Sequence, residues 1–211
     1  TVFLCDSSRS IPLAVYADAA ALSDMNWTNI GPSTSGAGLL YVSGSGTSKF
    51  TLTRCVLSSG LIYDPPPSGS FRSAGGALEI ELSALSPVNV SVSLVDVLFD
   101  KNTVKCSQDS CVGGAVAITV QETLIYGEGN INISGCEFVS NQIYASGTSN
   151  GMLGAGVYLT NYGSAALTVT MVDSIFTDTY MESTGGLVGS GGAYSFFNID
   201  FENEQRVYVD E

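Results

Sequence analysis

The chain has 211 residues, of which 45% are hydrophobic and 24 are glycine, so it can bury a core and is too apolar to be disordered. Seven basic residues against twenty acidic ones give a net charge of −13, which repels nucleic-acid phosphates and anionic membranes. No apolar run approaches the ~20 residues of a membrane-spanning helix. We therefore expect one domain with no nucleic-acid partner and no membrane insertion.

A short glycine motif recurs along the chain and defines an internal repeat. Its spacings of 39, 38, 41 and 37 residues average about 39. The glycines are expected to form tight corners where the backbone adopts a positive φ or approaches another segment closely. The five copies read "GAGLLYV" from Gly36, "GGALEIEL" from Gly75, "GGAVAITV" from Gly113, "GAGVYLT" from Gly154 and "GGAYSFF" from Gly191.

Apolar residues alternate with other residues after each corner, which predicts a half-buried strand. Leu78, Ile80 and Leu82 alternate with Glu79 and Glu81, and the glutamates predict which face meets water. The matching inward residues are Leu39 and Tyr41, then Val116, Ile118 and Val120, then Val157 and Leu159, then Tyr194 and Phe196.

A second apolar pattern with the spacing i, i+2, i+5, i+7 follows each of the first four corners. The three-residue step predicts a strand, a bend and a second strand. Val15, Ala17, Ala20 and Leu22 share the spacing and indicate an extra rung at the start. The four sets are Phe50, Leu52, Cys55 and Leu57; Val92, Leu94, Val97 and Phe99; Ile131, Ile133, Cys136 and Phe138; and Val169, Met171, Ser174 and Phe176.

These patterns predict an all-β solenoid, a parallel β-helix of about five coils with one repeat per coil. Neighbouring coils would lie ~4.8 Å apart and stack like residues into columns. We expect residues 1–35 to form a partial coil or cap and residues 36–211 to form the coils. A β-sandwich is the alternative, but it requires no 39-residue period.

The pairing of "GGA" plus an aliphatic residue with Phe-x-x-Asn, here "FDKN" (Phe99 to Asn102) and "FVSN" (Phe138 to Asn141), resembles a known family. Similar repeats occur in chlamydial polymorphic outer-membrane proteins and in related right-handed β-helix surface proteins of bacteria and protists. The resemblance spans roughly Gly36 to Phe197. It implies a right-handed β-helix with a role in surface architecture or adhesion, and it carries over no catalytic residue.

The cysteines fall into two groups. Cys55 and Cys136 share the inward column, so we expect buried, unreactive thiols. Cys106 and Cys111 stand in one loop, "KCSQDSC", where a disulfide can form in an oxidising compartment, and Cys5 is left over. Five free thiols in an intracellular protein are the alternative.

Three N-glycosylation sequons begin at Asn26, Asn89 and Asn132, although such triplets also arise by chance in a chain rich in Ser and Thr. Asn132 stands between inward Ile131 and Ile133, and Asn89 precedes inward Val90. Strand parity therefore predicts that Asn89 and Asn132 both point to solvent. We expect a secreted or cell-surface glycoprotein.

Catalytic chemistry is not predicted. The chain has no histidine, which excludes Ser-His-Asp triads and typical zinc sites, and no calcium-loop or phosphate-loop motif is present, so no metal or cofactor is expected. We expect a noncatalytic structural or adhesive module. The alternatives are a carbohydrate-binding module and a polysaccharide lyase or hydrolase, whose candidate carboxylates are Asp96, Asp100 and Asp173 with Lys101 or Lys105 as the cation.

The last repeat ends halfway round a coil, because "QRVYVDE" reaches only Val207 and Val209 of the second arc. An open coil end exposes unpaired backbone groups. We therefore expect the final coil to be completed by further repeats or by another subunit in a head-to-tail assembly. Acidic "FENEQ" serving as a plug is the alternative. Surface glycans are the other expected partner.

Overall fold

The computed structural model describes residues 2–6, 11–16, 19–28, 32–33, 40–45, 49–63, 75–83, 90–107, 110–120, 128–146, 151–161, 166–184, 189–190, 192–198 and 206–209. These residues form strands and tight bends, and none of them is helical. The all-β class predicted from the sequence is therefore confirmed.

The strands belong to five sheets, which we call A to D plus a three-stranded sheet. Sheet A contains β1 (Val2–Asp6), β2 (Ile11–Tyr16), β6 (Leu40–Ser45), β10 (Leu78–Ser83), β15 (Val116–Val120), β20 (Val157–Asn161) and β25 (Tyr194–Asn198). Sheet B contains β3 (Ala19–Ser23), β7 (Lys49–Thr53), β11 (Val90–Val95), β16 (Glu128–Ser134), β21 (Ala166–Val172) and β26 (Arg206–Val209).

Sheets C and D are built from shorter strands. Sheet C contains β4 (Asn26–Thr28), β8 (Val56–Ser58), β12 (Leu98–Asp100), β17 (Glu137–Val139) and β22 (Ile175–Thr177). Sheet D contains β5 (Pro32–Ser33), β9 (Leu61–Tyr63), β13 (Thr103–Cys106), β18 (Gln142–Ala145) and β23 (Tyr180–Ser183). The three-stranded sheet contains β14 (Ser110–Val112), β19 (Gly151–Leu153) and β24 (Gly189–Ser190).

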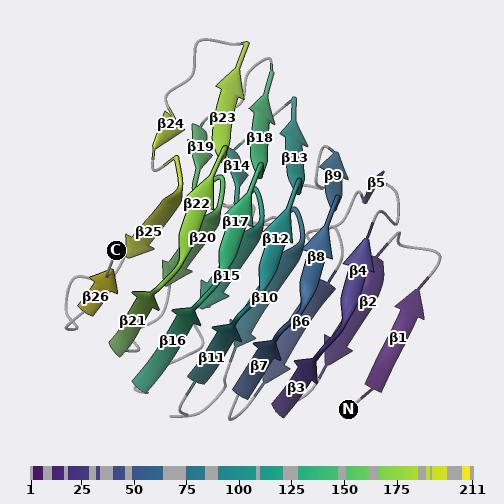
Figure 1. The fold of residues 1–211 in the computed structure, drawn as a ribbon, viewed down its shortest axis with the longest axis vertical. Helices are drawn as coiled ribbons and strands as arrows, with labels where there is room; N and C mark the ends of the chain where they lie inside the picture. Colours follow the sequence, from purple (N-terminus) through teal and green to yellow (C-terminus); the bar gives the residue numbers. More distant parts are fainter. Residues whose placement is uncertain are drawn as a thin grey trace.

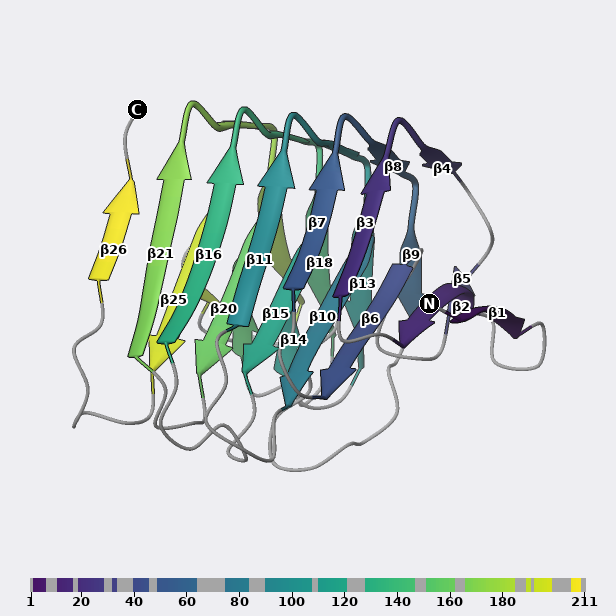
Figure 2. The same ribbon diagram turned by 90° about the horizontal axis from the view of Figure 1, so that it is seen from below.

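Consecutive strands along the chain lie in different sheets, and each pairs in parallel with its counterpart in the next repeat. The chain passes from β10 in sheet A to β11, β12, β13 and β14 before it returns to sheet A as β15. Figure 1 shows the strands of sheets B, C and D in front of sheet A, and Figure 2 shows sheet B running opposite to sheet A. The sheets are thus stacked parallel ladders, as a solenoid requires. The one antiparallel pair in the described sheets joins β1 to β2.

The second apolar pattern stacks as the spacing predicts. Phe50 pairs with Val92, Val92 with Ile131, and Ile131 with Val169. In sheet C the rings of Phe99 and Phe138 stack at 5.0 Å between centroids, and those of Phe138 and Phe176 stack at 4.6 Å. All residues in the first three sets of this pattern are buried, whereas Ser174 and Phe176 in the fourth set are partly exposed. The columns therefore form one continuous core.

Two details of the predicted register are wrong at the start of the chain. Leu78 pairs with Leu40, not Leu39, so the first copy of the corner motif is shifted by one residue. The extra rung is present but begins at Ala20 and not at Val15, five residues later than predicted. Ala20 pairs with Phe50, and Leu22 pairs with Leu52. A one-residue error reverses the face that a side chain occupies, and the ambiguous glycines around Gly36 permitted that error.

The face of sheet A that the glutamates were expected to expose is mostly buried. Glu79 is only 3% exposed, and Ala117, Thr119, Tyr158 and Thr160 on the same face are buried as well. Val112 and Leu153 of the three-stranded sheet pack with Ala117 and Tyr158 in a separate small core. Sheet A is therefore buried on both faces in these repeats, and alternation alone did not reveal the second layer.

The bend between sheets B and C recurs at one position in the five repeats where the structure describes it. Its residues have φ between 49° and 61°, the left-handed region that L-residues adopt rarely and that Asp and Gly tolerate better. This column explains the three-residue step of the sequence pattern, because the bend residue breaks strand parity. Its members are Asp24, Arg54, Asp96, Gly135 and Asp173.

The bend between sheets C and D carries the asparagines of the Phe-x-x-Asn motif, and both are fully buried. The Asn102 Oδ1 accepts a hydrogen bond from Gly60 N at 2.9 Å, and its Nδ2 donates to Leu57 O at 3.0 Å in the preceding coil. The Asn141 Oδ1 accepts from Asn102 N and Nδ2 at 3.1 and 2.9 Å, and its Nδ2 donates to Phe99 O at 2.9 Å. Each asparagine thus satisfies buried backbone groups of the coil before it.

The glycine corners bring adjacent coils into close backbone contact. A Cβ added at Gly76 would collide with the carbonyl oxygen of Gly114, and one at Gly114 would collide with that of Ala155. Gly113 and Gly154 also have φ values of 63° and 61°. Close approach therefore requires glycine at the second, third and fourth corners, and conformation also requires it at the third and fourth, whereas a Cβ added at Gly192 of the fifth corner would meet nothing within 4 Å.

We predict that Asn141→Ala lowers the free energy of unfolding by about 3 kcal/mol, because buried donors on Asn102 and the Phe99 carbonyl lose their partner. Chemical denaturation monitored by circular dichroism measures this change. Asn132→Ala is the matched control, since Asn132 lies on the outward side of β16 and its loss should change stability by less than about 0.5 kcal/mol. Equal effects of the two substitutions would contradict a structural role for the buried asparagine.

Candidate binding surface

The outward face of sheet D carries a row of large polar and aromatic side chains, one from each of four adjacent strands. Tyr63, Lys105, Tyr144 and Glu182 are register partners on β9, β13, β18 and β23. The residues between the outward positions, Ile62, Val104, Ile143 and Met181, face a second core. Alternation along four short strands therefore places these four side chains side by side, and we call them the sheet D row.

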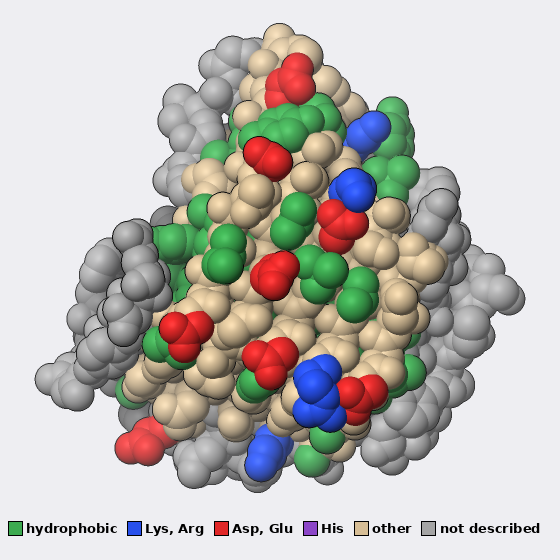
Figure 3. All heavy atoms as spheres, viewed as in Figure 1, with side chains coloured by type: hydrophobic (Ala, Val, Ile, Leu, Met, Phe, Trp, Pro, Cys, Tyr) green, Lys and Arg blue, Asp and Glu red, His purple; other side chains and the backbone are tan. Residues whose placement is uncertain are grey.

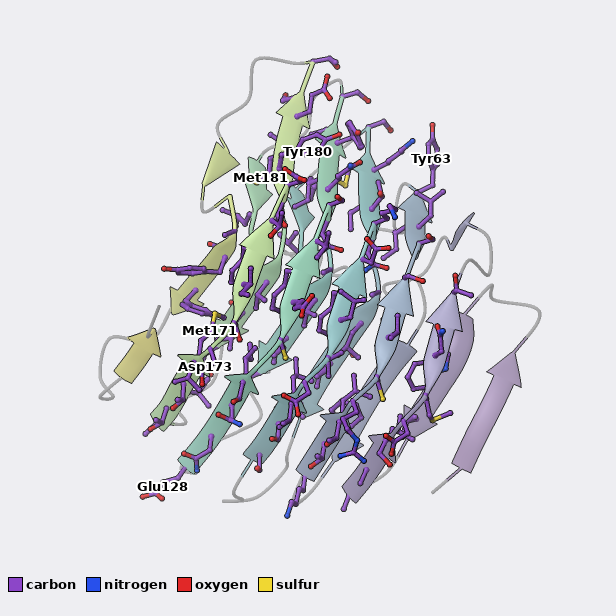
Figure 4. All side chains as sticks on the ribbon, viewed as in Figure 1. Tyr63, Glu128, Met171, Asp173, Tyr180 and Met181 are labelled. Carbon is purple, nitrogen blue, oxygen red and sulfur yellow. A yellow bond between two sulfur atoms is a disulfide. The ribbon has the colours of Figure 1, made fainter. Side chains whose placement is uncertain are left out.

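Aromatic side chains of this face are accessible to solvent. Tyr63 is 55% exposed and Tyr180, which precedes the row on β23, is 40% exposed. Figure 4 shows Tyr63 extending from the end of β9 and Tyr180 at β23 on the same face. In Figure 3 hydrophobic side chains gather over the upper part of this view, where sheet D lies, with charged side chains beside them. Most other large aromatic side chains described here are in the core.

Tyr144 is held by three neighbours. Its hydroxyl is hydrogen-bonded to the Tyr180 hydroxyl and to Gln142 Oε1, the latter at 2.9 Å. The two tyrosine rings meet edge to face with 5.9 Å between centroids, and the Lys105 Nζ lies 5.5 Å from the centre of the Tyr144 ring, within the range of a cation–π contact. The hydrogen bond to Tyr180, together with partial burial, raises the pKa of Tyr144 to about 12, so its phenol stays neutral.

A hollow of about 200 Å³ opens beside the row. Hydroxyl side chains, one ammonium group and one carboxylate surround the tyrosine rings. The backbone beneath is fixed between coils, because Ser146 N donates to Cys106 O at 2.8 Å and Thr184 N donates to Ala145 O at 3.0 Å. The lining residues are Tyr63, Lys105, Cys106, Ser107, Tyr144, Ala145, Ser146, Glu182 and Thr184.

Cys106 and Cys111 form a disulfide in the structure, as their shared loop predicted. Both sulfurs are buried in the second core behind sheet D. The bridge joins the end of β13 to β14 and so fixes the floor of the hollow at Cys106. A disulfide stabilises the folded state mainly by constraining the unfolded chain.

Cys55 and Cys136 are buried, free thiols, which confirms that prediction. The Cys55 Sγ lies 3.2 Å from Thr53 O, and the Cys136 Sγ lies 3.4 Å from Leu94 O. Burial raises the pKa of Cys136 to about 11, which keeps the thiol protonated and unreactive. The side chain of Cys5 lies outside the described residues.

None of the three carboxylates considered for catalysis lines the hollow, and two of them lie at bends. Asp96 and Asp173 occupy the exposed bend column two coils apart, with Gly135 between them. In the same column Arg54 makes two hydrogen bonds of 2.7 and 2.8 Å to Asp24, which lower the pKa of Asp24 and raise that of Arg54.

The remaining candidates for an enzyme are separated between two sheets. Asp100, on β12, lies 3.2 Å from the Lys101 Nζ. Lys105 belongs to the sheet D row instead. Among the described residues no group of three or more His, Cys, Asp or Glu side chains is placed to hold a metal ion.

Two of the predicted glycosylation sites lie within the described residues. Asn26 is exposed on β4, and Asn132 is partly exposed on the outward side of β16 between buried Ile131 and Ile133. Asn89 lies outside the described residues. The sites that are described can therefore be reached from solvent.

The sheet D row was not predicted from the sequence, because the apolar patterns indicated only three strands per repeat. The sequence did contain a signal, because inward apolar residues recur two positions after Asn102 and Asn141 and after Gly60 and Thr179, which align with them. These apolar residues are Ile62, Val104, Ile143 and Met181. Alternation about those residues assigns Tyr63, Lys105 and Tyr144 to one outward face. Each strand is only three or four residues long, too short for periodicity alone to detect.

Comparisons with protein-family models, with curated proteins and with solved structures found no significant match. The described part of the chain contains no helix able to cross a membrane. The site is therefore interpreted from its own geometry.

We predict that Tyr180→Phe shifts the pKa of Tyr144 from about 12 toward the ordinary tyrosine value near 10. NMR titration of the tyrosine ring carbons measures this shift. Because the folded state holds the proton more tightly, the associated stability is present below about pH 10 and lost as the pH rises to about 12. An unchanged titration of Tyr144 in the variant would show that the two hydroxyls are not bonded in solution.

Proposed function

We propose that the chain is a noncatalytic structural or adhesive module of an extracellular protein, built as a right-handed parallel β-helix of about five coils. The observation that carries the proposal is the role of the repeat's own polar residues. The side chains of Asn102 and Asn141 make hydrogen bonds between coils. The repeated motif therefore specifies a rod and not a reaction centre. The surface left outside this framework is free to vary and to bind.

The path of the chain supports a right-handed coil. In Figure 1 the strands of sheets B, C and D point upward in front, those of sheet A point downward behind, and successive coils advance from β3 toward β21. A chain that rises in front, descends behind and advances in that direction winds to the right. Parallel strand crossovers almost always have this hand, because a right-twisted strand packs back onto its sheet only that way.

An incubation with neutral and acidic polysaccharides tests the noncatalytic proposal against the lyase or hydrolase alternative. We expect no increase in reducing ends and no ultraviolet absorbance from unsaturated products over the incubation. A known lyase and a known hydrolase serve as positive controls on the same substrates. If either product appears and is lost in Asp96→Asn, Asp100→Asn or Asp173→Asn, the chain is an enzyme and the proposal is wrong.

The Cys106–Cys111 disulfide supports an extracellular location, because disulfides persist in oxidising compartments. The exposed sequon asparagine Asn26 and the outward Asn132 are consistent with a secreted glycoprotein. A peptide map of the protein from its native source should show the Cys106–Cys111 pair and a glycan on Asn26, Asn89 or Asn132. Reduced cysteines together with three unmodified asparagines would contradict the extracellular proposal.

A further inference from the structure

The sheet D row has the composition of a saccharide site. A sugar ring presents hydroxyl groups at its edge and a flat set of C–H groups on its face, so it binds where an exposed aromatic ring adjoins hydrogen-bonding side chains. Tyr63 offers the exposed ring. Ser107, Ser146 and Thr184 surround the hollow with hydroxyls, while Lys105 and Glu182 add a donor and an acceptor.

In the row, the backbone and the Tyr144 side chain are fixed before any ligand binds. Its members stand on paired strands with neighbouring coils ~4.8 Å apart, and Tyr144 is fixed by its bonds to Gln142 and Tyr180 and by Lys105 beside its ring. The disulfide fixes Cys106 at the floor. A preorganised site of this kind loses little conformational entropy on binding.

The charges in the row favour a neutral ligand. One ammonium, Lys105, and one carboxylate, Glu182, lie in the same row, and Tyr144 remains a neutral phenol. The chain as a whole carries −13, which repels polyanions such as acidic polysaccharides and nucleic acids. The two local charges therefore cancel, which suits a neutral ligand, and the overall charge disfavours an anionic partner.

We propose that the hollow beside the sheet D row binds a neutral saccharide chain, with one sugar ring stacked on Tyr63, hydroxyls beside that ring bonded to Lys105, and hydroxyls of a sugar farther along the saccharide bonded to Glu182. The saccharide would run along the axis of the rod, across successive coils. This inference rests on the proposed adhesive function and specifies its ligand class. It assigns recognition to the surface residues of sheet D and leaves the coil framework unchanged.

Isothermal titration calorimetry of the whole protein with neutral oligosaccharides of glucose, mannose, xylose and N-acetylglucosamine tests the proposal. Oligogalacturonate and a polyproline peptide serve as the anionic and the peptide probe. Binding of at least one neutral oligosaccharide is expected. Tyr63→Ala should weaken it by about tenfold or more, because stacking on one aromatic ring contributes on that scale. Tyr63→Phe should retain it within about twofold, since the ring and not the hydroxyl stacks.

Tyr194→Ala is the matched control, because Tyr194 is an exposed tyrosine on sheet A and its removal should leave binding unchanged. Thermal unfolding of each variant checks that it remains folded. Neutral saccharide binding that Tyr63→Ala does not weaken would overturn the site. Binding of only oligogalacturonate or only the peptide, or of no probe by folded protein, would overturn the ligand class. Cleavage of a bound saccharide would instead contradict the noncatalytic proposal, so the two failures are distinguishable.

Discussion

The structure depends on the hydrogen bonds that each buried asparagine makes to the coil before it. A coil that bends between sheets C and D must turn its backbone inside a dry core, where unpaired amide and carbonyl groups are costly. Asn102 and Asn141 satisfy those groups from a neighbouring coil. The bend therefore forms with its partner in register, and the register in turn aligns the apolar columns.

The two ends of this ladder show how the interaction can be varied. Gly60 occupies the asparagine position in the preceding coil, and its backbone N–H donates a hydrogen bond to Asn102 Oδ1. Thr179 occupies it in the following coil, and its hydroxyl donates to Phe138 O at 3.2 Å. Thr179 thus keeps one of the bonds that asparagine makes. Sheet D begins at the next residue column, from Leu61 to Tyr180, so the ladder also sets the position of the proposed binding surface.

Much of the fold follows from the sequence because a solenoid repeats its constraints. The i, i+2, i+5, i+7 spacing identified the strands of sheets B and C, and Phe-x-x-Asn marked the bend that follows. The sequence did not show that both faces of sheet A are buried. Glu79 lies on a buried face of sheet A, although charged residues are seldom fully buried, and nothing in the local pattern indicates the second layer.

The binding surface was harder to predict than the framework. Tyr63, Lys105, Tyr144 and Glu182 are three residue types at one repeat position, so no single letter marks all four copies in the sequence. They become a site only when the coils stack and place them in one row. Short strands make this assignment depend on register, and register depends on the asparagine bend that precedes each strand.

The stacking of coils in this register is the central claim, and engineered cross-linking tests it most directly. Ser93 and Asn132 are partners on the outward face of β11 and β16, so Ser93→Cys combined with Asn132→Cys should give an intrachain disulfide on mild oxidation. Mass spectrometry of the digested protein identifies the linked peptides. Ser91→Cys with Asn132→Cys, displaced by two residues, should link far less. Efficient linking of the displaced pair, or none of the matched pair in folded protein, would contradict the register.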